Sequence, residues 1–102
     1  MKKLNIVLPA HNEHNNISPI YKEIILALAN CKYPYEILFI DDGSTDDTLA
    51  QIKALSAEDS KVKYIELSRN FGHQNALKAG LDMCNADIII TMDCVLQHPP
   101  HL

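Results

Sequence analysis

Four polar clusters stand out in this sequence, because each places chemically capable side chains directly after an apolar segment. They occupy residues 9–13, 41–44, 68–72 and 93–98, and read Pro-Ala-His-Asn-Glu, Asp-Asp-Gly-Ser, Ser-Arg-Asn-Phe-Gly and Asp-Cys-Val-Leu-Gln-His. Together they supply carboxylates, an arginine and backbone amides, the groups that hold a base, a ribose and a metal-bound diphosphate. The clusters therefore favour nucleotide chemistry if the fold brings them together.

The apolar segments before these clusters predict the elements that must position them. Short runs rich in branched side chains predict strands over residues 4–10, 36–40, 62–67 and 87–92. Helical patterns separate them, so the predicted order is β-α-β-α-β-α-β, a Rossmann-like α/β fold with a mostly parallel sheet and helices on both faces. Because ligands bind beyond the carboxyl ends of parallel strands, the four clusters should share one edge of the sheet.

The helices are predicted from capping residues and apolar stripes. Ser18 is expected to cap the first helix with Pro19 at its first position, and Thr45 or Asp46 to cap the second. The stripes expected to face the sheet are Ile20, Ile24, Ala27 and Leu28 in the first helix, Leu49, Ile52, Ala54 and Leu55 in the second, and Ala76, Leu77, Ala79, Gly80, Leu81 and Met83 in the third.

Composition narrows the class of protein. The chain has 102 residues, of which 47% are hydrophobic and 22% charged, the balance of one ordinary globular domain. Its formal charge of −4 gives no support to binding of nucleic acid or anionic lipid. Three cysteines without a C-x-x-C spacing suggest neither a disulfide framework nor a zinc site, and no apolar run is long enough to span a membrane.

Phosphate must be held without the common glycine-rich loops. Neither G-x-G-x-x-G nor G-x-x-x-x-G-K-[ST] occurs in the chain, which has only three glycines. A divalent cation bridged by Asp93 is the expected substitute, since Mg²⁺ and Mn²⁺ favour carboxylate oxygen and leave positions open for phosphate. Asp42, beside a glycine turn, suits a different task, because its carboxylate can accept hydrogen bonds from the N–H groups of a base.

The four clusters, taken in order, carry a resemblance to a known family. The blocks are Pro9 with Asn12-Glu13, residues 40–46 (Ile-Asp-Asp-Gly-Ser-Thr-Asp), residues 68–73 (Ser-Arg-Asn-Phe-Gly-His), and Met92-Asp93 with residues 96–100 (Leu-Gln-His-Pro-Pro). This combination resembles family 2 glycosyltransferases of the GT-A fold, and within them the polyprenyl-phosphate sugar transferases typified by dolichol-phosphate mannose synthase and bactoprenol glucosyltransferase. The resemblance covers essentially the whole chain.

The resemblance implies roles for particular positions. Those expected to bind the nucleotide are Pro9, His11, Glu13, Asp41, Asp42, Arg69 and Gly72, and those expected to hold Mg²⁺ or Mn²⁺ are Asp93 and Gln97. Asp93 would begin a D-x-D element, but Val95 stands where such enzymes carry the second acidic residue. His11 likewise replaces a more usual aromatic residue. One carboxylate should weaken the metal site without abolishing it, because water and phosphate can complete the coordination.

The resemblance also implies the reaction and its setting. Residues 1–102 would be the N-terminal nucleotide-sugar-binding part of a truncated GT-A domain, ending in an irregular tail at Pro99 and Pro100. The whole enzyme would transfer a sugar from a UDP- or GDP-linked donor to an acceptor, expected to be a polyprenyl phosphate, by metal-assisted inverting displacement at the cytoplasmic membrane face. Its general base, acceptor site and membrane helices would follow Leu102, so this chain alone should be inactive. A sheet edge exposed by truncation favours self-association.

Other interpretations remain open from the residues themselves. A receiver-like signalling domain also carries an acidic pair at a strand end, but after its first strand, whereas Asp41 and Asp42 follow the second. A nucleotide-binding protein that has lost catalysis is compatible with Val95. Asp41-Asp42 could also be ordinary turn chemistry, Glu13 a solvated loop acid and Arg69 a surface residue. Titration with UDP and GDP, with and without Mn²⁺, separates these hypotheses.

Overall fold

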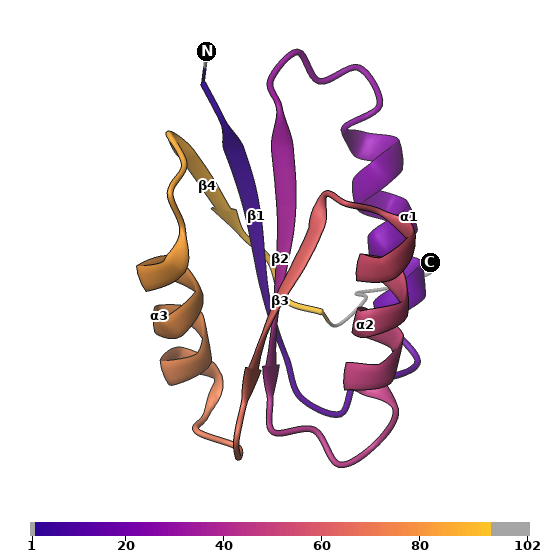
Figure 1. Cartoon of the computed structure of the whole chain (residues 1–102), viewed down its shortest axis with the longest axis vertical. Helices are drawn as coiled ribbons and strands as arrows, with labels where there is room; N and C mark the ends of the chain where they lie inside the picture. Colours follow the sequence, from indigo (N-terminus) through magenta and orange to yellow (C-terminus); the bar gives the residue numbers. More distant parts are fainter. Residues whose placement is uncertain (1, 95–102) are drawn as a thin grey trace, which may run out of the picture.

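The computed structural model describes residues 2–94, and in this part strands and helices alternate along the chain (Figure 1). The strands are β1 (Leu4–Ala10), β2 (Tyr35–Asp42), β3 (Val62–Leu67) and β4 (Ile88–Thr91), and the helices are α1 (Ile17–Ala27), α2 (Thr48–Glu58) and α3 (His73–Met83). The predicted β-α-β-α-β-α-β order is confirmed. The irregular tail predicted at Pro99 and Pro100 lies outside the described residues.

The four strands form one parallel sheet in the order β3-β2-β1-β4. β1 pairs with β2 on one side and with β4 on the other, and its last residue, Ala10, lies opposite Asp41. β2 in turn pairs with β3, so that Asp42 lies opposite Leu67. The carboxyl ends of the four parallel strands therefore point toward the same edge: β2 and β3 end at the bottom of Figure 1, and the shorter β4 ends higher, opposite Val7 of β1. β3 and β4 are the outer strands of the described sheet, and self-association along such an edge stays a prediction.

Helices cover both faces of the sheet, with α1 and α2 on one side and α3 on the other (Figure 1). Alternate residues of the central strands belong to two hydrophobic cores, one on each face of the sheet, because side chains along a strand point to opposite faces. Leu8 and Phe39 pack with the residues of α1 and α2, while Val7 and Ile40 pack with Ala76 of α3. Burial on both faces explains why β1 and β2 are almost continuously apolar.

Helix α3 approaches the sheet closely because a glycine faces it. A Cβ placed on Gly80 would lie 2.5 Å from Cδ1 of Ile40 and 2.9 Å from Cγ1 of Val7. Ala76, one turn earlier, is also fully buried. The small residues at these two positions fix the height of α3 above β1 and β2, and with it the position of the first turn of the helix.

The helices begin at different residues from those predicted. α1 starts at Ile17 with Asn16 at its N-cap, so Ser18 and Pro19 lie inside the first turn. α2 starts at Thr48 with Asp47 at its N-cap, and neither N-cap residue makes a side-chain cap hydrogen bond. The carboxylate of Asp46 nevertheless accepts a hydrogen bond from the Thr48 amide at 2.9 Å. Several neighbouring polar side chains can satisfy the free amides of a first turn, which is why composition alone misplaced these starts.

Some residues assigned to the apolar stripes point to solvent. Ala27 and Ala54 are exposed, and Leu81 and Met83 of α3 are 39% and 70% exposed. α3 meets the sheet along Ala76 and Gly80, which are four residues apart on one face, so Leu81 and Met83 lie on other faces of the helix. β2 also runs two residues further than predicted, to Asp42, and β4 is shorter than the predicted 87–92.

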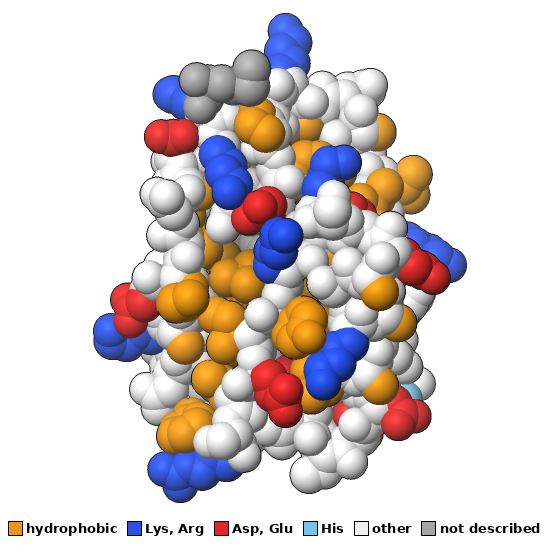
Figure 2. Space-filling view, in the orientation of Figure 1, with side chains coloured by type: hydrophobic (Ala, Val, Ile, Leu, Met, Phe, Trp, Pro, Cys, Tyr) orange, Lys and Arg blue, Asp and Glu red, His pale blue; other side chains and the backbone are white. Residues whose placement is uncertain are grey.

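The surface mixes charged side chains of both signs with hydrophobic ones. Figure 2 shows Lys and Arg interspersed with Asp and Glu, and a band of hydrophobic side chains between α3 and the β3 side of the sheet. Ile65, Leu67 and Leu77 are partly buried residues that pack against the core on this face. Among the helices of the described residues, none has the length and apolar character that crossing a membrane requires.

Candidate functional site

The carboxyl edge of the sheet holds a pocket of about 520 Å³, a size within the usual range for small-molecule sites. All four polar clusters contribute to it, together with the first residue of α3. The lining residues are Pro9, Ala10, His11, Glu13, Asp42, Asn70, His73, Asp93 and Cys94. The expectation that one edge gathers the four clusters is thus met in the described structure.

The loop after β1 is tied to the loop after β2 by hydrogen bonds between side chains and backbone. Asn12 has a left-handed φ of 54°, and its amide donates to Oγ of Ser44 at 2.9 Å. Its side-chain Oδ1 accepts from the Thr45 amide at 2.8 Å, while the Glu13 amide donates to Oγ1 of Thr48 at 2.8 Å. These contacts hold Glu13 at the pocket wall.

Asp42 ties the loop after β2 to the loop after β3. Its side chain is only 2% exposed, and its two carboxylate oxygens accept hydrogen bonds from the amides of Phe71 at 2.7 Å and Gly72 at 3.1 Å. Next to it, Gly43 has a φ of 66° and lies so close to the backbone of Arg69 that a Cβ would be 2.3 Å from the Arg69 carbonyl carbon. The Asp42 carboxylate and Gly43 therefore let the backbone after β2 pack directly against the backbone after β3, and this contact forms one wall of the pocket.

His11 has its ring orientation fixed by the backbone. Its Nδ1 lies 2.7 Å from the carbonyl oxygen of Asp42, and since a carbonyl only accepts, Nδ1 carries the proton. The other ring nitrogen, Nε2, lies 3.4 Å from Nδ2 of Asn12. His11 thus presents an imidazole ring of fixed orientation at the position where the resemblance expected an aromatic residue.

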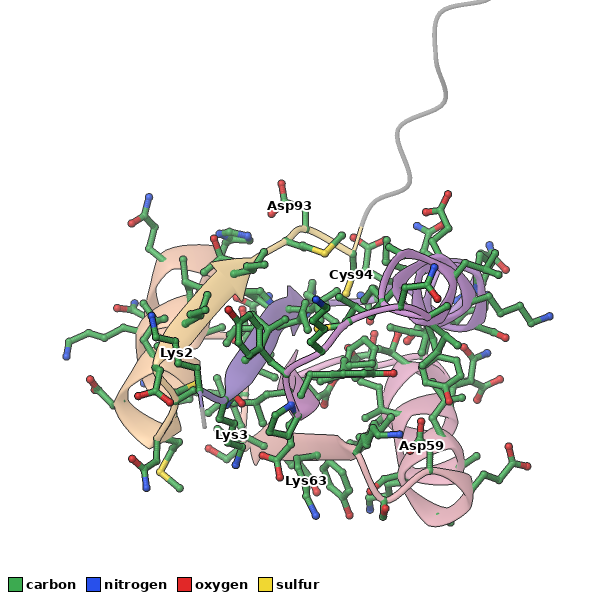
Figure 3. The ribbon with its side chains drawn as sticks, turned by 90° about the horizontal axis from the view of Figure 1, so that it is seen from above. Lys2, Lys3, Asp59, Lys63, Asp93 and Cys94 are labelled. Atoms are coloured by element: carbon green, nitrogen blue, oxygen red, sulfur yellow. The ribbon has the colours of Figure 1, made fainter. Side chains whose placement is uncertain are left out.

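The segment after β4 directs two neighbouring side chains in opposite directions. Figure 3 shows Asp93 pointing outward from the ribbon and Cys94 pointing toward the interior. Asp93 Oδ1 lies 2.9 Å from Nε2 of His73, and both side chains are more than half exposed. Burial, and after it the negative charges of Glu13 and Asp93, raise the pKa of the Cys94 thiol to about 12. Cys94 is therefore a packed thiol with little thiolate character.

The pocket wall is acidic. Glu13, Asp42 and Asp93 supply carboxylates, and within the described residues neither Lys nor Arg appears in the lining. An anionic diphosphate would meet repulsion here without a cation, while hard divalent ions bind carboxylate oxygen. Asp42 and Glu13 already accept hydrogen bonds, Glu13 from Nδ2 of Asn16 at 2.9 Å. Asp93 also has one oxygen in contact with Nε2 of His73, but it is the most exposed of the three carboxylates.

The described side chains supply only some of the ligands that a divalent metal ion needs. Across residues 2–94, no group of three or more His, Cys, Asp or Glu side chains is arranged to hold an ion. A site here would therefore need ligands from the nucleotide and water, which is how proteins commonly bind Mg²⁺. Gln97, the other predicted metal ligand, and Val95 lie outside the described residues.

Three predicted nucleotide-binding residues lie outside the pocket lining, and their roles stay predictions. Asp41 is 2% exposed, and its Oδ1 is buried without a hydrogen-bond partner in the described structure. Because side chains alternate along β2, Asp41 faces away from the side on which Asp42 lies. Arg69 stacks its guanidinium 4.5 Å from the ring centre of Phe71, and Gly72 contributes its amide to Asp42.

Sequence reasoning missed His73 as part of the site. It was recognised only as the end of the cluster 68–73, and no role was assigned to it. The signal was available, since the first residue of a helix that follows a parallel strand lies at the ligand-binding edge. Asn70 also lines the pocket and was quoted without a role.

Solved structures with the same fold define the class of this chain as a GT-A glycosyltransferase domain. It superposes on Staphylococcus aureus TarS 1-349, solved in complex with UDP-GlcNAc, with a TM-score of 0.71, 25% identity, and coverage of 90% of this chain and 26% of that one. Glucosyl-3-phosphoglycerate synthase from Mycobacterium tuberculosis, solved with Mn²⁺, UDP and glucosyl-3-phosphoglycerate, gives a TM-score of 0.68 at 26% identity, with coverage of 91% and 33%.

The sequence assigns the chain to a family within that class. The model of glycosyl transferase family 2 matches residues 5–102, and the chain belongs to this family. It is 46% identical over 99 residues to CsbB of Bacillus subtilis, named as a glycosyltransferase, covering 97% of this chain. It is 40% identical over 101 residues, or 98% of the chain, to the undecaprenyl-phosphate 4-deoxy-4-formamido-L-arabinose transferase of Klebsiella pneumoniae. The chain spans 30–31% of the length of these two relatives.

Proposed function

We propose that this chain is the N-terminal nucleotide-sugar-binding part of an enzyme that transfers a sugar from a UDP- or GDP-linked donor to a polyprenyl phosphate. The observation that carries the proposal is the pocket itself, in which segments from all four strand ends present an acidic wall at the carboxyl edge of a parallel sheet. The undecaprenyl phosphate acceptor named for the Klebsiella relative supports the acceptor class. An acceptor embedded in a membrane supports the proposed location of the enzyme, the cytoplasmic membrane face.

In the proposed complex, different residues of the pocket contact different parts of the nucleotide. Pro9, His11 and Glu13 line the wall after β1, and Asp42 lines the wall after β2. Each oxygen of the Asp42 carboxylate has a remaining lone pair, so it can still accept a hydrogen bond from a base while it holds the Phe71 and Gly72 amides. Asp41, Arg69 and Gly72 complete the predicted set, and Gly72 contributes by donating its amide to Asp42.

A divalent cation, Mg²⁺ or Mn²⁺, completes the site. It would neutralise the diphosphate as this group departs, acting as a Lewis acid and a template. Asp93 would hold it, with help from Gln97. The solved relative crystallised with Mn²⁺ and UDP supports this choice, and so does the acidic wall, which disfavours an anion unless a cation accompanies it.

Transfer itself needs residues beyond this chain. In the proposed inverting displacement an oxygen of the acceptor phosphate attacks the anomeric carbon, and a general base would assist from the part of the relatives' length that this chain does not span. The chain should therefore bind the nucleotide and fail to transfer sugar. Incubation with a labelled sugar nucleotide and undecaprenyl phosphate should give no product above background, and turnover would contradict this part of the proposal.

Calorimetric titration tests the binding part. UDP and GDP are each titrated into the chain with Mn²⁺, and again with the metal removed by a chelator. We expect one of the two nucleotides to bind, at least tenfold more tightly with Mn²⁺, and Asp93→Asn to remove most of the metal-dependent gain. Asp82→Asn is the matched control, because Asp82 is equally exposed but pairs with Lys78 on α3, outside the pocket lining. Absence of binding of either nucleotide would refute the proposal, whereas metal-independent binding would favour a nucleotide-binding protein without catalysis.

A further inference from the structure

We propose that His73 is a second protein ligand of the divalent cation, and that its imidazole takes the place of a second carboxylate beside Asp93. This inference rests on the proposed function, because the cation would be bound together with a nucleoside diphosphate. It concerns the pair formed by Nε2 of His73 and Oδ1 of Asp93, which lie 2.9 Å apart at the pocket wall.

The separation of these two atoms suits one shared ion. Two adjacent ligands of an octahedral cation with bonds of about 2.1 Å lie about 3 Å apart, the length of one edge of the octahedron. In the structure these atoms form a hydrogen bond, and since a carboxylate oxygen accepts, Nε2 of His73 is the donor. A cation would displace this proton to solvent or to Nδ1, and Nε2 and Oδ1 would then bind the ion from neighbouring positions.

The surroundings leave the remaining coordination positions open. The side chains of His73 and Asp93 are 57% and 65% exposed. Besides the main pocket, both line a second hollow of about 160 Å³, which also includes Pro9. Phosphate oxygens could thus approach from the main pocket and water from the smaller one, which matches the preference of Mg²⁺ and Mn²⁺ for a few protein ligands supplemented by phosphate and water.

His73 is held firmly enough to act as a ligand. It is the first residue of α3, and this helix is fixed against the sheet by Ala76 and by Gly80, whose close approach to Ile40 leaves no room for a side chain. The amide of Ala76 donates to the carbonyl of Gly72 at 2.9 Å, which closes the first turn beneath His73. A ligand on a rigid helix loses little entropy on binding an ion.

The donor set also predicts a preference among metals. An imidazole nitrogen suits first-row transition metals, whereas Mg²⁺ prefers an all-oxygen environment. A pair of one carboxylate and one imidazole should therefore favour Mn²⁺ over Mg²⁺ more strongly than two carboxylates would. Mn²⁺ is the natural probe, since its electron spin also reports on the atoms that coordinate it.

A second histidine–aspartate pair in the chain offers a matched control. Nδ1 of His14 lies 2.6 Å from Oδ2 of Asp46, but neither residue lines the pocket. The other oxygen of Asp46 accepts hydrogen bonds from the amide and hydroxyl of Thr48. This pair has the same chemistry without the open positions, so it should not bind the ion.

The test measures the ligands of the metal directly. The chain is loaded with UDP, or with GDP if that is the nucleotide it binds, and with one equivalent of Mn²⁺. Electron-spin-echo modulation then reports directly coordinated nitrogen. We expect a nitrogen modulation that changes when the protein's histidines are labelled with ¹⁵N, that disappears in His73→Ala, and that persists in His14→Ala. The affinity for Mn²⁺ in the presence of the nucleotide should fall at least tenfold in His73→Ala and change less than twofold in His14→Ala.

The outcomes separate this inference from the proposed function. If the ternary complex forms without nitrogen modulation, or if the modulation survives in His73→Ala, His73 is no ligand and the inference is overturned while the proposed function stands. If the unaltered chain binds no Mn²⁺ with either nucleotide, both fail. His73→Gln, which keeps a polar side chain of similar length, provides a second variant whose fold is checked by circular dichroism.

Discussion

The carboxylate of Asp42 provides the sharpest test of how the pocket is built. It is 2% exposed and accepts hydrogen bonds from two backbone amides of the loop after β3, those of Phe71 and Gly72. In Asp42→Asn one side-chain oxygen remains an acceptor, but the other becomes an NH₂ group that faces a peptide N–H. The substitution is nearly equal in volume, so any loss of stability reports hydrogen bonding and charge rather than packing.

The expected loss can be worked out from these contacts. A hydrogen bond to a charged group contributes about 1.5–3 kcal/mol, and a buried donor left unpaired costs a further 1–3 kcal/mol, roughly. We therefore expect Asp42→Asn to lower the free energy of unfolding by about 2.5–6 kcal/mol. With a urea m-value of about 1.5 kcal/mol/M for a chain of this size, the midpoint should fall by about 2–4 M. Nuclear magnetic resonance should show the amide protons of Phe71 and Gly72 shifting and exchanging faster with solvent.

The neighbouring aspartate is the control. Asp41 is equally buried, yet its Oδ1 has no hydrogen-bond partner among the described residues. Asp41→Asn should leave stability unchanged within about 0.5 kcal/mol or increase it, because the substitution breaks no hydrogen bond to Oδ1. If Asp41→Asn proves as destabilising as Asp42→Asn, or if Asp42→Asn unfolds like the unaltered chain, the hydrogen-bond account of the pocket wall is wrong.

Two further predictions concern the turn after β2 and the contact between α1 and α2. Gly43→Ala should lower stability by about 2–4 kcal/mol in urea unfolding, since φ is 66° and a Cβ would also lie 2.3 Å from the Arg69 backbone. Gly72→Ala meets no neighbouring atom, but its φ of 97° and ψ of 152° suit only glycine, so backbone strain alone should cost about 1–3 kcal/mol. A smaller loss at Gly43 than at Gly72 would contradict the steric argument. The hydroxyl of Tyr21 donates to Asp59 at 2.6 Å, and this hydrogen bond, with burial, raises the pKa of Tyr21 to about 12. Its stabilising effect is therefore complete below pH 10 and lost as the pH rises toward 12, so Tyr21→Phe should melt at a lower temperature than the unaltered chain at pH 8, with the difference shrinking above pH 10; a constant difference would refute the assignment.

Much of the fold follows from short-range patterns in the sequence. The bounds of β1 and β3 were predicted to the residue, because each is an apolar or alternating run that ends in a polar cluster. The helix starts were not, since Asn16, Asp46 and Asp47 all compete with the expected caps for the first free amides. Capping preferences identify the stretch of sequence in which a helix begins, whereas the path of the preceding loop decides which residue becomes the N-cap.

The candidate site was also predicted only in part. Parallel topology was sufficient to predict that four distant clusters share an edge, as the pocket lining shows. It could not separate Asp41 from Asp42, because the predicted strand ended at Ile40, while β2 continues through both and must turn them to opposite faces. Nor could it find the contact between His73 and Asp93, which depends on the height of α3 above the sheet and thus on packing at Gly80.

The hydrogen bonds from backbone amides to Asp42 have an evolutionary consequence. Since Phe71 and Gly72 contribute only their N–H groups to this contact, mutation can replace the phenyl ring by almost any side chain without loosening the loop, and proline, which lacks the N–H, is the evident exception. Side chains of this loop, whose Asn70 lines the pocket, are thereby decoupled from the hydrogen bonds that hold the loop. They can change over evolution while the backbone of the pocket wall stays in place.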